Sequence, residues 1–114
     1  MTALDRAKEV ARLLDSKKGD EVRVLHIGTL TTIGDYFVVA TGGSTTQVKA
    51  LADAVDEQLS AEDLQPRRVE GYNTASWILM DYNDVIIHIF LKETREFYSL
   101  ERLWGDAPEV EWNN

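Results

Sequence analysis

Few residues of this 114-residue chain have the types and spacing that catalysis or metal binding requires. The only two histidines, His26 and His88, each fall in a predicted strand, and they lack the i, i+4 helical spacing of a zinc site. Asp81 and Asp84 resemble paired metal-binding carboxylates, but aspartate also supports tight turns by accepting backbone N–H groups. Cysteine is absent, which excludes thiolate ligands and disulfides. The sequence therefore predicts no catalytic centre, no metal site and no cofactor.

The stretch from Gly42 to Thr46 is the one candidate for binding a phosphate. It joins a predicted strand to a predicted helix, where backbone N–H groups can cradle an anion. A turn is the simpler interpretation, because glycine permits a sharp bend and Ser44 or Thr45 can cap the helix. No Gly-Lys-Ser/Thr motif follows. A nucleotide-binding or nucleotidyltransferase-type enzyme that uses this turn is the alternative function.

Two short apolar runs, residues 76–81 and 85–91, predict a β-hairpin. Asn83 and Asp84 lie between them and tolerate the positive φ of a tight turn. Successive side chains point to opposite faces of a strand, so with this turn the hairpin residues divide into two sets, one on each face. The aliphatic set, which we expect to form core, pairs Tyr82 with Val85, Met80 with Ile87 and Ile78 with Ile89. The opposite set, named here the mixed face, pairs Trp77 with Phe90, Leu79 with His88 and Asp81 with Ile86.

The mixed face combines large apolar groups with a histidine and a carboxylate. That combination is typical of the centre of a protein-binding patch. A second layer of the same domain, or an identical subunit, would cover such a face equally well, because aromatic stripes are more often core than binding site. The residues themselves leave both interpretations open.

Hydrophobic spacing predicts the elements that position the hairpin. Helices are predicted over residues 3–16, with Thr2 as N-cap, and over residues 47–61. Strands are predicted over residues 21–27, 35–41 and 67–70, and the second of these is nearly all apolar, as in a central strand. A one-turn helix is expected over residues 100–104. The charged side chains of residues 93–102 are interpreted as pairing with one another.

This order of elements predicts an α/β domain with a mixed β-sheet and helices packed mainly on one face. The two long helices can cover one face, so part of the mixed face is expected to stay free. Residues 1–108 are predicted to form a single domain, and residues 109–114 an acidic, flexible tail.

The net charge of −8, from twenty acidic and twelve basic residues, opposes direct binding to a phosphate backbone. An acidic domain is steered toward a basic partner, such as a ribosomal protein. There is no apolar run long enough to span a membrane and no secretory leader at the first residue. We therefore expect a cytoplasmic protein with little direct nucleic-acid contact.

Three blocks of sequence resemble one known family. DYFVVATGGSTTQVKALADAV (residues 35–55), EGYNTASWILMDYNDVIIHIF (residues 70–90) and KETREFYSLERLWGDAP (residues 92–108) resemble the signature blocks of the Iojap-like ribosomal silencing factors, RsfS. The blocks have the order and spacing of that family and span most of the chain. One departure is Asn83, which stands where the family pattern has glycine. Asparagine is the next best residue for a left-handed turn, so the hairpin should survive.

The resemblance implies a fold similar to nucleotidyltransferases but without their catalysis. It implies binding to a protein of the large ribosomal subunit, ribosomal protein fourteen, at the surface where the small subunit would dock. Joining of the subunits would then be blocked, and translation would be repressed when nutrients are limiting. The free protein could also form a homodimer through the same face.

By analogy with the family blocks, the partner contact is expected on seven residues. Trp77 and Phe90 are expected to be buried anchors, and Asp81 and Glu101 to pair with basic side chains of the partner. The full set is Trp77, Leu79, Asp81, His88, Phe90, Tyr98 and Glu101.

Overall fold

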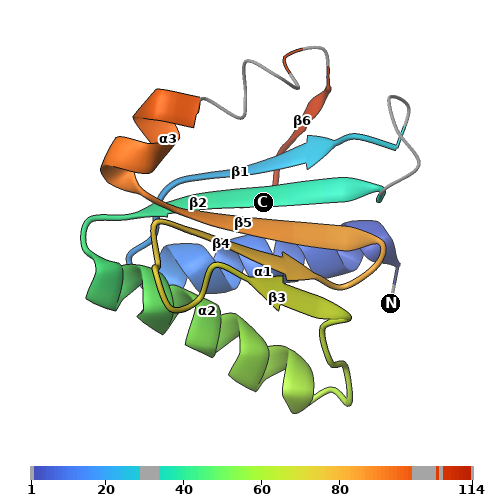
Figure 1. Cartoon of the computed structure of the whole chain (residues 1–114). Helices are drawn as coiled ribbons and strands as arrows, with labels where there is room; N and C mark the ends of the chain where they lie inside the picture. The colour runs from blue at the N-terminus through green and yellow to red at the C-terminus, as the bar shows by residue number, and fades with distance from the viewer. Residues whose placement is uncertain (1, 29–33, 99–104, 106, 114) are drawn as a thin grey trace.

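The computed structural model describes residues 2–28, 34–98, 105 and 107–113, and within these ranges six strands form one mixed sheet. The strand order is β3-β4-β5-β2-β1-β6, with three helices packed around it (Figure 1). The strands are β1 (Asp20–His26), β2 (Tyr36–Gly42), β3 (Arg68–Glu70), β4 (Trp77–Asp81), β5 (Val85–Leu91) and β6 (Glu109–Val110). The helices are α1 (Ala3–Ser16), α2 (Thr45–Ser60) and α3 (Lys92–Tyr98). The predicted α/β class with a mixed sheet is confirmed.

The centre of the sheet is the parallel pair β2 and β5. The other strand pairs are antiparallel, which makes the sheet mixed. From Phe37 to Gly42, every residue of β2 is buried. A strand with neighbours on both edges and packing on both faces can bury consecutive side chains, so the predicted central strand is confirmed.

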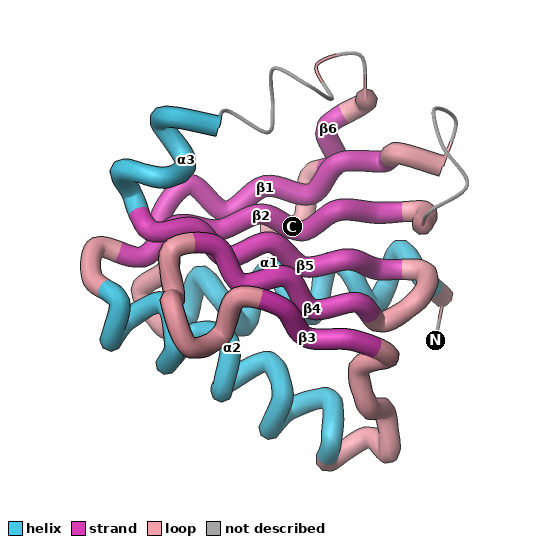
Figure 2. Tube along the Cα trace, viewed as in Figure 1, coloured by secondary structure: helices cyan, strands magenta, loops and turns pink. Residues whose placement is uncertain are grey.

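Helices α1 and α2 lie against the same face of the sheet, as Figures 1 and 2 show. Thr2 caps α1 by accepting from the Asp5 N–H, while Asp5 accepts in return from the Thr2 N–H. Ser44 caps α2 by accepting from the Gln47 N–H. These caps satisfy N–H groups that have no partner within the helix. Both predicted long helices are confirmed, and they bury a core with Val38, Ala40, Ile78, Met80, Ile87 and Ile89 of the sheet.

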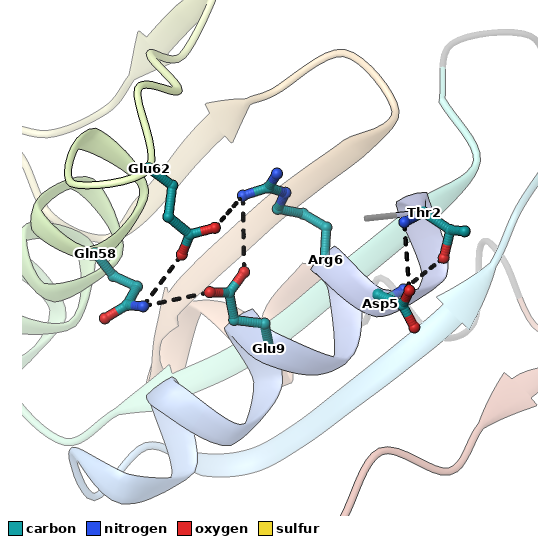
Figure 3. Close-up of polar contacts among 6 residues, drawn as sticks. All are labelled: Thr2, Asp5, Arg6, Glu9, Gln58 and Glu62. Carbon is teal, nitrogen blue, oxygen red and sulfur yellow. Dashed lines mark hydrogen bonds and ion pairs between the residues drawn. The ribbon is translucent and has the colours of Figure 1, made fainter.

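A small polar network joins α1 to α2 at the rim of this core (Figure 3). Arg6 donates to Glu62 at 2.9 Å, and the Gln58 amide donates to both Glu62 and Glu9. Burial, together with a hydrogen bond to Glu62, raises the pKa of Glu9. Glu9 is therefore the carboxyl of the pair that takes a proton first.

The β4–β5 hairpin has the predicted register at every paired position. Trp77 lies opposite Phe90, Leu79 opposite His88, and Asp81 opposite Ile86. Asn83 has φ +76°, and the Tyr82 N–H donates to the Val85 carbonyl at 3.0 Å. Asparagine thus occupies the left-handed turn position, as expected where the family pattern has glycine.

Helix α3 was not predicted. It follows β5 directly and lies across the molecule from α2 (Figure 1). Its Arg95 is buried and donates to the Glu21 carbonyl at 2.8 Å and to Thr41 Oγ1 at 2.6 Å. This buried side chain therefore joins α3 to β1 and β2. The predicted one-turn helix over residues 100–104 lies outside the described residues.

The predicted acidic tail includes a short strand. Glu109 and Val110 form β6, which pairs with Leu25 and Val24 of β1. The indole N–H of Trp112 donates to the Val22 carbonyl at 3.1 Å. β1 would otherwise be an edge strand, and its backbone groups on that side accept a short strand. In the part of the chain that the structure describes, no helix is both long and apolar enough to cross a membrane.

Candidate partner-binding face

Strand alternation brings five of the seven expected site residues onto one face. Trp77, Leu79 and Asp81 come from β4, and His88 and Phe90 from β5. Tyr98 is the last residue of α3, but its side chain and the whole of Glu101 lie outside the described residues.

Gly71 fixes the start of β4, a constraint that the sequence analysis missed. Its φ is +80°, and a Cβ at this position would collide with the Trp77 carbonyl oxygen. The Ala75 N–H then closes the turn by donating to the Gly71 carbonyl at 2.9 Å. Glycine is therefore required here to place Trp77 at the edge of the mixed face.

An aromatic cluster forms the floor of the mixed face. The ring centroids of Trp77 and Phe90 lie 4.8 Å apart, and Phe37 of β2 meets His88 edge-on at 4.5 Å. Phe90 is fully buried, whereas Trp77 and Leu79 are partly exposed. Phe90 was expected to be an anchor for the partner, but in the folded chain it has no exposed surface and supports Trp77 from beneath.

His88 is buried in a defined tautomer. The indole N–H of Trp77 donates to His88 Nδ1 at 3.0 Å, so this nitrogen is an acceptor and carries no proton. Burial lowers the pKa of His88 to about 4, so the ring is neutral at pH 7. The proton is therefore on Nε2, which is buried and has no hydrogen-bond partner among the described residues.

Asp81 is held by contacts within the chain. Its carboxylate accepts from the Asn83 N–H at 2.8 Å and from the Arg67 guanidinium at 3.2 Å. Arg67 also donates to the side-chain oxygen of Asn83 at 3.0 Å. In the folded chain this buried carboxylate is thus paired with Arg67, and its pairing with a basic side chain of a partner stays a prediction.

A hollow of about 330 Å³ opens on the mixed face beside His88. The side chains of Arg67 and Arg68 in its lining are 63% and 60% exposed, so both guanidinium groups face solvent. The sequence analysis did not include these two arginines in the site. The predicted strand over residues 67–70 could have indicated them, because it precedes the hairpin and pairs with β4. The lining consists of Phe37, Arg67, Arg68, Leu79, Asp81, Asn83, Ile86 and His88.

The turn from Gly42 to Thr46 uses its polar groups for its own structure. The Gly43 N–H donates to the Gln47 side-chain oxygen at 2.7 Å, and Ser44 Oγ accepts from the Gln47 N–H. The Gln47 amide group donates in turn to the Lys18 carbonyl at 2.9 Å. This arrangement is that of a capped turn. Within the described residues, no three His, Asp or Glu side chains gather as metal ligands.

The fold and this face together define a class: a small α/β domain in which helices cover one face of a mixed sheet and leave partly exposed apolar groups on the other. The particular family follows from comparison with known proteins. The family model described as "Ribosomal silencing factor during starvation" (RsfS) matches residues 1–114, and the chain belongs to this family.

Individual relatives agree with this assignment. The chain is 40% identical to the ribosomal silencing factor RsfS of Halalkalibacterium halodurans, over 86% of this chain and 84% of that protein. It is 37% identical to the RsfS of Bacillus subtilis, over 89% of this chain and 86% of that protein. A crystal structure of a Chromobacterium violaceum protein matches with a TM-score of 0.88 and 32% identity, covering 100% of this chain and 94% of that one.

Proposed function

We propose that this chain is a ribosomal silencing factor that acts in the cytoplasm on the large ribosomal subunit. Its mixed face would bind a basic protein of that subunit, ribosomal protein fourteen. The bound domain would then block joining of the small subunit sterically and repress translation under nutrient limitation. The observation that carries this proposal is the pair Trp77 and Leu79, partly exposed on the sheet face that α1 and α2 leave uncovered.

Charge supports a protein partner rather than ribosomal RNA. The chain has a net charge of −8, and each contact with a phosphate needs a basic side chain. A basic ribosomal protein is instead attracted by an acidic domain, which favours encounter and orientation. Direct contact with nucleic acid is therefore expected to be small.

The proposed contact centres on Trp77 and Leu79, with Tyr98 and Glu101 added by the family resemblance. Phe90 contributes by holding Trp77 in place, and His88 by bonding its indole N–H. An interface of standard size buries roughly 800 Å² on each partner. Since central aromatic residues dominate such interfaces, Trp77 is expected to contribute most of the affinity.

A regulatory role needs no catalysis, and we propose that the chain is not an enzyme. The alternative, a nucleotide-binding or nucleotidyl-transferring enzyme, would use the turn from Gly42 to Thr46. There the Gly43 N–H and the Ser44 side chain are already bonded within the turn, so the geometry gives this alternative no support.

The same face is proposed to form a homodimer when the protein is free. Sedimentation velocity of the wild type and Trp77→Ala would test this. A wild-type dimer that becomes a monomer on substitution is the expected result, whereas a dimer that persists in Trp77→Ala would contradict the assignment of this face.

A subunit-joining assay tests the proposed function. Isolated large subunits are incubated with the chain, small subunits are added, and complete ribosomes are measured in a sucrose gradient. The wild type should reduce the ribosome peak in proportion to its binding, and Leu79→Glu should leave joining intact. Undiminished joining in the presence of large subunits saturated with the wild-type chain would overturn the steric mechanism.

A further inference from the structure

The mixed face contains a hydrogen-bond donor whose direction is fixed by the chain itself. His88 Nδ1 accepts the Trp77 indole N–H at 3.0 Å, so Nε2 carries the ring proton. Nε2 is buried and has no partner among the described residues, although His88 lines the hollow. A buried donor without an acceptor costs folding free energy. Such a group is therefore a candidate for a bond formed on binding.

The charged groups around the hollow indicate which acceptor fits. Three charged side chains line it: Arg67, Arg68 and Asp81. Asp81 is buried and already neutralised by Arg67 at 3.2 Å, so it presents no free negative charge to the hollow. Among the residues that the structure describes, Arg68 forms an ion pair with Glu70 alone, and both side chains are more than half exposed. Exposed pairs of this kind contribute little and exchange readily with another partner.

We propose that the hollow binds a carboxylate of the partner protein, with His88 Nε2–H donating to one oxygen and Arg68 pairing with its charge. This inference rests on the proposed docking of the mixed face and adds the chemistry of one contact. A lysine or arginine of the partner would instead point its own N–H donors at the Nε2–H donor. Its positive charge would also be repelled by Arg67 and Arg68.

The contact is therefore a source of specificity within an otherwise acidic domain. The chain as a whole attracts a basic partner, but this hollow selects one acidic side chain and rejects a basic one at that position. Because Nε2 is covered in the free chain, a lining side chain must shift for the carboxylate to reach it. Arg68 is the lining arginine with more freedom to do so, because its ion pair with Glu70 is exposed, whereas Arg67 is held by Asp81 and Asn83.

The substitution His88→Asn removes the Nε2–H donor and keeps an acceptor for the Trp77 indole. The asparagine side-chain oxygen can still accept from the Trp77 indole, while the donor at the Nε2 position is lost. Bonds to charged groups are strong, so affinity for isolated large subunits should fall at least about tenfold. Arg68→Gln should weaken binding by about threefold. The matched control is Glu70→Gln, which frees Arg68 and should bind as tightly as the wild type or more tightly.

The measurement is the affinity of each labelled protein for isolated large subunits, from titrations at constant salt. If the wild type binds and His88→Asn binds equally well, the inference is overturned while the docking function stands. If His88→Asn weakens binding but Arg68→Gln does not, the carboxylate is overturned as the ligand. If the wild type fails to bind, the proposed function fails, and this inference fails with it. If His88→Asn does not fold by circular dichroism, Arg68→Gln decides, because its side chain lies at the exposed rim.

Discussion

The two faces of the β4–β5 hairpin are built from alternate residues of the same two strands, yet they differ in chemistry. On one face Ile78, Met80, Ile87 and Ile89 are buried under α1 and α2. On the other, Trp77 and Leu79 stay partly exposed beside a histidine and a paired aspartate. The helix-covered face stabilises the fold, and we propose that the two partly exposed side chains of the mixed face recognise a partner.

Truncation of the two faces should separate these roles most strongly. Ile87 is fully buried, so Ile87→Ala should lower the free energy of unfolding by about 2–5 kcal/mol. Leu79→Ala should cost less, about 1 kcal/mol, because Leu79 is already partly in contact with water. Urea denaturation of both variants measures the difference. Equal losses would show that the mixed face is packed as tightly as the core.

The histidine of the mixed face should make stability depend on pH. The pKa of His88 is lowered by burial to about 4, below the value of about 6.5 for an unfolded chain. As the pH falls, the unfolded state binds the proton first. The stability that neutral His88 contributes is therefore fully present above pH 6.5 and is lost as the pH falls toward 4. The loss should be about 3 kcal/mol.

His88→Asn provides the control for this pH dependence. Its unfolding free energy should fall less steeply between pH 6.5 and 4, while the carboxylates titrate as in the wild type. Identical slopes for the two proteins would mean that His88 is not buried in its neutral form.

Tyr82 breaks the apolar character of the helix-covered face. Its hydroxyl is buried without a hydrogen-bond partner among the described residues, and burial raises its pKa to about 12. Tyr82→Phe should therefore be as stable as the wild type or more stable, by up to about 1 kcal/mol. It should also lack the loss of stability that the wild type shows above pH 10. Thermal unfolding at pH 7 and pH 10.5 checks both, and a clearly less stable variant would reveal a bond to the hydroxyl.

The smallest effect is expected at the rim between α1 and α2. The raised pKa of Glu9 means that its ionised form is disfavoured in the folded chain, so its contribution is present at acid pH and lost as the pH rises. Glu9→Gln should stabilise the protein at pH 7 by a few tenths of a kcal/mol, since the group is partly solvated. The gain should vanish near pH 4. A destabilised variant at pH 7 would mean that the pairing of Glu9 with Arg6 outweighs the repulsion from Glu62.

Much of the fold could be predicted from sequence because local signals agreed with one another. Asn83 and Asp84 set the hairpin turn, and the turn then fixed every pair from Trp77–Phe90 to Asp81–Ile86. Capping residues and helical spacing located α1 and α2. The parallel pairing of β2 with β5 depends on contacts between distant segments, which local patterns do not specify.

The details of the site were harder to predict for the same reason. Arg67, just before β3, forms an ion pair with Asp81 of β4, so a side chain outside the hairpin neutralises this carboxylate. Arg95 was interpreted as part of a local charge cluster, and its burial through contacts with β1 and β2 depends on distant segments that local patterns do not specify. The tautomer of His88 follows only from the position of the Trp77 indole.

The most direct test of the account is the affinity of two matched variants for isolated large subunits. Leu79→Glu places a charge on the mixed face, and Ala50→Glu places the same charge at an exposed position of α2. Both change the net charge equally, and circular dichroism would confirm that both fold. The account predicts that Leu79→Glu weakens binding by at least about a hundredfold while Ala50→Glu binds like the wild type. Equal affinities of the two variants, or a loss confined to Ala50→Glu, would contradict docking through the mixed face.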